Sequence, residues 1–117
     1  MNEVEKMYRN SGIEKHKKTM LDIETGKNVL TLDSFYPEFT AEKQLELIKW
    51  LGSIKDYIVE IDKFKGVYYV GCREAGSNNK HWGSHNLFEE ALAELINDLW
   101  QDLTEVEHTQ IKEVLSE

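Results

Sequence analysis

The chain has 117 residues, of which 40% are hydrophobic and 31% charged, and its 22 acidic and 14 basic side chains give a formal net charge of −8. This length predicts one domain, the hydrophobic fraction excludes a disordered chain, and the single cysteine excludes an internal disulfide. The negative charge disfavours direct binding to nucleic acid, and no apolar run is long enough to span a membrane, so we expect a cytoplasmic protein.

The first third of the chain gives weak structural signals. A short helix is predicted over residues 2–9, with Val4, Met7 and Tyr8 on one side. Residues 19–33 are typical of a β-hairpin with its turn at Glu24–Lys27, because two β-favouring runs flank a glycine. Within the single domain, 1–117, we expect residues 1–34 to form a weakly ordered extension and residues 35–117 to form the core.

The clearest helix signal lies over residues 40–52. Apolar residues, Leu45 among them, recur at helical spacing after Thr40, whose hydroxyl suits an N-cap. Strands are expected at 57–61 and 67–70, where β-branched and aromatic residues flank a hairpin-length loop. Residues 74–86 show no periodicity and are rich in Gly, Ser and Asn, which predicts a loop.

Two amphipathic helices are predicted at the end of the chain, over 87–101 and 104–116. Asn86 with Glu89 and Thr104 with Glu107 have the spacing of capping boxes. The fold class is therefore expected to be α+β, a short antiparallel sheet packed by helices, in the order α-(ββ)-α-β-β-α-α.

The excess negative charge lies in these last two helices. Residues 87–117 contain nine carboxylates and one basic residue, Lys112, a balance equal to the −8 of the whole chain. The charges avoid the apolar stripes, which fits either a solvated surface or a surface that meets a basic partner. The carboxylates expected to contact such a partner are Glu89, Glu90, Glu94, Asp98, Asp102, Glu105 and Glu107.

The predicted loop 74–86 and its approach form the second candidate for recognition. This segment places a rigid aromatic ring, Trp82, among polar groups, which is typical of contact surfaces. The residues expected to contact a partner are Arg73, Asn78, Asn79 and Trp82. An equally open interpretation is that Trp82 folds back as a lid on the core.

A metal or thiol site is the alternative interpretation of the same region. Cys72, His81 and His85 are residue types that bind zinc, but eight residues separate Cys72 from His81, unlike the close ligand pairs of zinc motifs. Cys72 or Ser84 beside a histidine would make a nucleophile, but no motif orders them. We therefore expect no metal, no cofactor and no enzymatic activity, with a small metal-dependent or thiol-dependent module as the alternative.

The segment Phe39–Leu51 resembles small, mostly uncharacterised proteins encoded by phages and prophages of Gram-positive bacteria. The likeness continues through Val67–Val70 and Glu89–Ala93, covers residues 35–101, and is also loosely similar to the phage α/β/α sandwich domain. These motifs are helix-packing patterns, so the resemblance implies a genomic setting and a fold and transfers no functional residue.

The charge distribution and the resemblance together predict a phage-encoded acidic protein that acts in the bacterial host cytoplasm. In this anti-CRISPR-like hypothesis it inhibits a host defence protein by presenting carboxylates, in partial mimicry of DNA, to a basic nucleic-acid-binding surface. Neither nucleic acid nor a membrane is then a direct partner. An alternative is a homo-oligomeric accessory phage protein whose apolar stripes on 87–101 and 104–116 pair with a second copy, so both a monomer and a homodimer are open.

Overall fold

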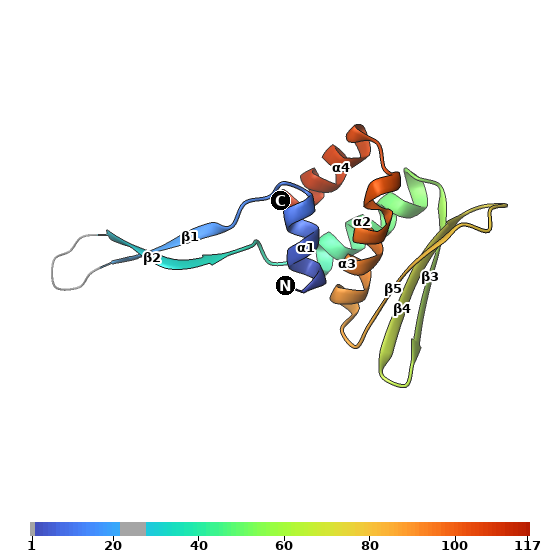
Figure 1. The fold of residues 1–117 in the computed structure, drawn as a ribbon, viewed down its shortest axis with the longest axis horizontal. Coiled ribbons are helices and arrows are strands. Elements are labelled where there is room, and N and C mark those ends of the chain that lie inside the picture. Colours follow the sequence, from blue (N-terminus) through green and yellow to red (C-terminus); the bar gives the residue numbers. More distant parts are fainter. Residues whose placement is uncertain (1, 22–27) are drawn as a thin grey trace.

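The chain is an α+β protein, and the computed structural model describes its residues 2–21 and 28–117 (Figure 1). The helices are α1 (Glu3–Asn10), α2 (Ala41–Ser53), α3 (Phe88–Leu99) and α4 (Glu105–Ser116), and a short 3₁₀ helix, η1 (Trp100–Asp102), follows α3. The strands are β1 (His16–Leu21), β2 (Asn28–Phe35), β3 (Tyr57–Phe64), β4 (Val67–Glu74) and β5 (Lys80–His85). The predicted turn Glu24–Lys27 lies outside the described residues.

The main sheet is antiparallel, with β4 between β3 and β5. Strands β3 and β4 pair from Tyr57 opposite Glu74 to Phe64 opposite Val67, so both are longer than predicted. The two residues that join them, Lys65 and Gly66, have φ values of 50° and 79°. Positive φ at both positions is the geometry of a tight hairpin whose twist matches the strands.

Strand β5 corrects the prediction of a loop over residues 74–86. It pairs with β4, with Cys72 opposite His81 and Gly71 opposite Trp82. Gly83, whose presence favoured a loop, is required by packing, because a Cβ at this position would overlap the Ala91 carbonyl oxygen of α3. The glycine thus lets the backbone of β5 lie directly against a helix.

Helix α3 is the centre of the core. It packs against β5 on one side and α1 on the other, while α2 contacts β3 and α4. The completely buried α3 side chains include Leu92, Leu95, Ile96 and Leu99. Helix α1 adds Met7 and Tyr8, which are also completely buried, and the Tyr8 ring stacks on Tyr36 with 5.4 Å between centroids. The apolar stripe of α3 is therefore buried against other elements of the same chain.

The hairpin prediction is confirmed, since β1 and β2 pair antiparallel from His16 opposite Phe35 to Leu21 opposite Asn28. These strands pair with each other and not with the three-stranded sheet. Figure 1 shows strands β1 and β2 projecting together away from the helices. We call the paired strands, residues 16–21 and 28–35, the arm.

Helix caps agree with the sequence at two of three sites. The Thr40 hydroxyl accepts the Lys43 N–H at 3.2 Å, and Thr104 forms a capping box with α4. The predicted cap at Asn86 is wrong, because α3 begins after Leu87 without a side-chain cap. Leu45 belongs to the apolar spacing that predicts α2, but its side chain is 51% exposed.

None of the helices in the described residues combines the length and the apolar character needed to cross a membrane.

Candidate functional site

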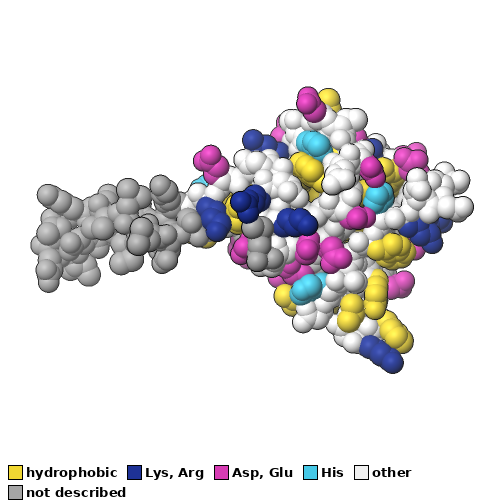
Figure 2. Space-filling view, in the orientation of Figure 1, with side chains coloured by type: hydrophobic (Ala, Val, Ile, Leu, Met, Phe, Trp, Pro, Cys, Tyr) yellow, Lys and Arg dark blue, Asp and Glu magenta, His cyan; other side chains and the backbone are white. Residues whose placement is uncertain are grey.

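Three of the predicted partner-binding carboxylates form a row on one side of α3 and η1. Glu94, Asp98 and Asp102 are spaced four residues apart, about one helical turn between neighbours. The side chains of Asp98 and Asp102 are 54% and 63% exposed. We call these three residues the acidic strip. Figure 2 shows acidic side chains gathered where α3 runs between α1 and the sheet.

His81, on the neighbouring strand β5, contacts two of the three carboxylates of the acidic strip. Its Nδ1 lies 2.8 Å from Oδ2 of Asp98, and its Nε2 lies 3.3 Å from Oδ2 of Asp102. The contact with Asp98 has hydrogen-bond geometry, whereas Nε2 and the Asp102 oxygen are within ion-pair distance. The two carboxylates are therefore held around a single imidazole, which limits their side-chain freedom.

Glu90 was predicted to contact a partner, but its side chain is buried and stabilises the fold instead. It is only 6% exposed, and its Oε2 accepts the backbone N–H groups of Glu3 at 2.8 Å and Val4 at 3.4 Å. These groups begin α1 and have no acceptor within their own helix. A carboxylate from α3 thus caps α1, in the position where the helix dipole favours a negative charge.

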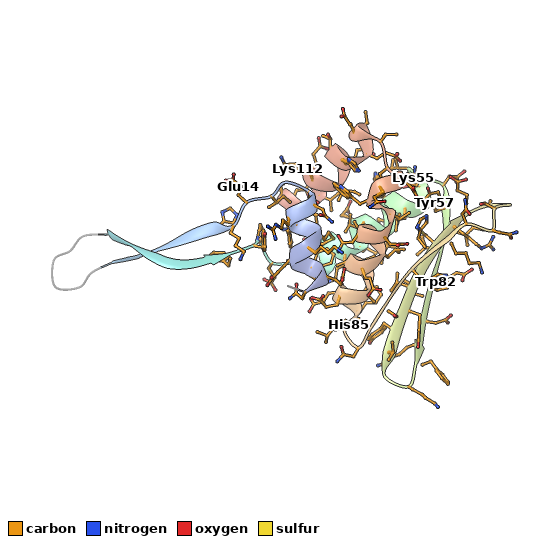
Figure 3. All side chains as sticks on the ribbon, viewed as in Figure 1. Glu14, Lys55, Tyr57, Trp82, His85 and Lys112 are labelled. Carbon is orange, nitrogen blue, oxygen red and sulfur yellow. The ribbon has the colours of Figure 1, made fainter. Side chains whose placement is uncertain are left out.

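Glu107 is likewise held in internal contacts. Its Oε2 lies 2.5 Å from Nζ of Lys55, and its Oε1 accepts the backbone N–H of Thr104 at 3.0 Å. Burial raises the pKa of Glu107, but the hydrogen bonds from Lys55 and Thr104 and the charge of Lys55 outweigh it, so the pKa is lowered overall. The hydrogen bond to Glu107 raises the pKa of Lys55. Figure 3 shows Lys55 beside Tyr57, where the chain enters β3.

The last two predicted acidic contacts lie in the first turns of their helices. Glu89 is half-buried at the start of α3, and Glu105 is exposed at the start of α4. Negative side chains complement the helix dipole at these positions. Both residues therefore contribute to their own helices, whatever else they contact.

The predicted recognition loop is largely replaced by strand. Arg73 lies in β4 and Trp82 in β5, while Asn78 and Asn79 lie in the connection between these strands. A Cβ at Gly71 would be 2.5 to 2.7 Å from three ring atoms of Trp82, so the indole lies flat on the backbone of β4. The interpretation of Trp82 as a lid on the core is wrong, because the ring covers the face of the sheet turned away from α3 and is 39% exposed (Figure 3).

The candidate metal and thiol residues do not form one cluster. Cys72 and His81 lie opposite each other on β4 and β5, but His85 is four residues further along and its Nδ1 accepts the Leu87 N–H at 3.1 Å. In the part of the chain that the structure describes, no group of three or more His, Cys, Asp or Glu side chains is placed to hold a metal ion. Burial, and secondly the charge of Asp98, raises the pKa of the Cys72 thiol to about 12. Such a thiol is protonated and a poor nucleophile at neutral pH.

One surface was not predicted from the sequence, a groove of about 480 Å³ on the outer face of the sheet. A signal for it exists in the period-two alternation of the strands, which places Ile58, Glu60, Asp62 and Phe64 on one face of β3. The groove is lined by Asp62, Lys63, Phe64, Tyr69 and Trp82. We call it the aromatic groove.

No family model matches the chain, and neither a curated protein nor a solved structure matches it. The likeness to phage proteins therefore stays a prediction, and the function is argued from the geometry of the described residues.

Proposed function

We propose that this chain is a non-enzymatic protein-binding protein whose partner carries a basic surface. The nucleic-acid-binding groove of a host defence protein, as expected for a phage-encoded inhibitor, is such a surface. The observation that carries the proposal is the acidic strip on α3 and η1, in which the side chains of Asp98 and Asp102 are more than half exposed. Binding there would exclude nucleic acid from the partner.

The spacing of the strip supports partial rather than complete mimicry of DNA. Four residues of helix rise about 6 Å, so the strip offers one charge per ~6 Å of its length. A single strand of duplex DNA carries one phosphate per ~3.4 Å. The strip thus presents roughly half the charge density of one strand, and shape-specific contacts must supply the remaining affinity and the specificity.

A polar hollow beside the strip adds to the negative surface. It has a volume of about 470 Å³ and lies between α1 and α3. Asn97 Nδ2 donates to the Glu3 carboxylate at 2.8 Å, which brings a further acidic group to this side of α3. Three carboxylates line the hollow against one basic side chain, and its lining residues are Glu3, Lys6, Glu94, Asn97, Asp98 and Gln101. A basic side chain of the partner would therefore be attracted into it.

The test is capture of a partner from the lysate of a Gram-positive bacterium, by the native chain and by two charge-reversed variants. The first variant carries Glu94→Lys, Asp98→Lys and Asp102→Lys, and leaves Glu90 and Glu107 unchanged because they stabilise the fold. The matched control reverses three exposed carboxylates elsewhere, Glu46, Glu113 and Glu117.

We expect the strip variant to lose the captured protein and the control variant to retain it. We also expect capture to weaken with salt and duplex DNA to displace the captured protein, because the contact replaces phosphates. Equal loss in both variants would show that only net charge matters, and retention in both would show that the strip is not the contact. Either result would overturn the proposal.

The arm favours a second candidate, a homo-oligomeric accessory protein. An isolated two-stranded hairpin is marginal in water, and its outer edges offer unpaired backbone groups. Pairing of the arm with a second copy would satisfy them, whereas the stripe on α3 is buried in the chain's own core. Light scattering of the native chain decides this, since a monomer at all concentrations would refute it.

A further inference from the structure

The outer face of the three-stranded sheet is aromatic, and no helix in residues 2–21 and 28–117 covers it. Side chains alternate along each strand, so the residues next to buried Val70, Cys72 and Gly83 point away from α3. Several large apolar side chains are exposed on this part of the molecule, and Figure 2 shows hydrophobic side chains over the sheet at the lower right. Those with outer-face positions are Ile58 at 40%, Phe64 at 63%, Tyr69 at 37% and Trp82 at 39% exposure.

Gly71 gives the aromatic groove its shape. The Trp82 ring lies on this glycine, so the indole extends from edge strand β5 across central strand β4. Trp82 is 39% exposed, so part of the ring that does not meet the backbone faces solvent. Tyr69 stands next on β4, directly opposite Asp62 of β3. The indole, the phenol and the carboxylate therefore line one groove from three different strands.

The groove lining contains one carboxylate, Asp62, and one basic residue, Lys63. Within the described residues, no basic group forms an ion pair with Asp62. Lys63 belongs to the lining, but its Nζ lies 4.8 Å from the ring centre of Tyr68, on the inner face of the sheet. Arg73 Nε lies 3.6 Å from Oε1 of Glu60, so its charge is offset by a carboxylate of the same face.

One aromatic side chain of the groove already contacts a cation. Nζ of Lys65 lies 5.3 Å from the ring centre of Phe64. A cation is attracted to the face of an aromatic ring at this separation, and most strongly to the face of tryptophan. The open face of Trp82 is thus the strongest free cation-binding face of the groove.

We infer that the aromatic groove binds a cationic side chain of a partner protein, namely lysine, methylated lysine or arginine. The open indole face and the phenol of Tyr69 hold the cation through their electron-rich faces, and Asp62 supplies the opposite charge. Phosphate groups are disfavoured by Asp62 and by the net charge of −8. This site lies on the sheet rather than on α3, so it stands or fails separately from the acidic strip.

The test is a titration of the ¹⁵N-labelled full chain with small probes, followed through the indole N–H signals. The cationic probe is acetyl-trimethyllysine methylamide, and the matched neutral probe is acetyl-norleucine methylamide. The signal absent from the Trp82→Phe spectrum identifies Trp82. We expect the cationic probe to shift this signal and the neutral probe to leave it unchanged at the same concentration.

Two substitutions test the role of charge without changing the core. Asp62→Asn should weaken binding of the cationic probe by about tenfold, whereas Glu113→Gln, an exposed carboxylate on α4, should leave it unchanged. The strip variant should bind the probe as the native chain does. The inference is overturned if norleucine acts equally well, if Asp62→Asn has no effect, or if a dT oligonucleotide shifts Trp82 and displaces the probe.

Discussion

Gly83→Ala should destabilise the chain by about 3 kcal/mol. The added Cβ would overlap the Ala91 carbonyl oxygen and lie 2.8 Å from the Leu95 nitrogen. Both obstacles are backbone atoms of α3, so no side chain can rotate away and β5 must separate from the helix. Overpacking of this kind typically costs about 1–3 kcal/mol, and more where the neighbouring atoms cannot move. Because the neighbours here are helix backbone atoms, we expect a cost at the upper end of this range.

Thermal unfolding followed by circular dichroism measures the loss. For a chain of this size, about 3 kcal/mol corresponds to a fall in Tm of roughly 10 °C. Gly52→Ala is the matched control, because Gly52 lies within α2 and a Cβ there meets nothing within 4 Å. It should raise stability by about 0.5–1 kcal/mol. Equal Tm values for the two variants would refute the close contact between β5 and α3.

Three further predictions concern Tyr8, Cys72 and Glu107. Tyr8→Phe should leave the free energy of unfolding in urea unchanged or raise it by up to ~1 kcal/mol. The reason is that the buried Tyr8 hydroxyl has no hydrogen-bond partner among the described residues. A clear loss of stability would show that the hydroxyl does have a partner. Cys72 should react with a disulfide reagent at pH 8 roughly a thousandfold more slowly than a free thiol, because the pKa of its thiol is about 12 rather than 9. Rapid labelling of the native chain would instead support the thiol-dependent alternative. Glu107→Gln should cost about 1–2 kcal/mol at pH 7. The pKa of Glu107 is lowered in the folded chain, so its contribution to stability is complete above the usual value of 4.5 and is lost as the pH falls through the lowered pKa. A stability difference between variant and native chain that does not shrink as the pH falls below 4.5 would contradict the assignment.

Local signals were sufficient for most helices. Thr40 and the pair Thr104 and Glu107 act within one turn of the chain, so their roles follow from spacing alone. The side of α2 that is buried could not be predicted in the same way. Lys43 is 8% exposed and its Nζ donates to the Leu115 carbonyl oxygen at 2.9 Å, a partner 72 residues away, while apolar Leu45 is left in solvent. Tertiary contacts decided which residues are inside.

The same distinction explains what was missed at the candidate sites. Gly83 and Ser84 favoured a loop because composition does not show which helix will pack against a strand. Glu90 has the same local pattern as the exposed acidic residues after it, and its capping role depends on α1 arriving beside α3. The spacing of Glu94, Asp98 and Asp102 was visible in the sequence, but the histidine that holds two of them comes from another strand.

The cap that Glu90 provides for α1 has a consequence for synthesis of the chain. The first turn of α1 is synthesised before its acceptor, Glu90, which lies 87 residues later in the chain. At about 5–20 residues per second, the helix waits roughly 5–20 s for that carboxylate. Until then Met7 and Tyr8, which end up completely buried, lack the α3 side chains of the core. Helix α1 is thus made before α3 but capped only after it, and a nascent chain that stops before α3 leaves Met7 and Tyr8 open to chaperones and proteases.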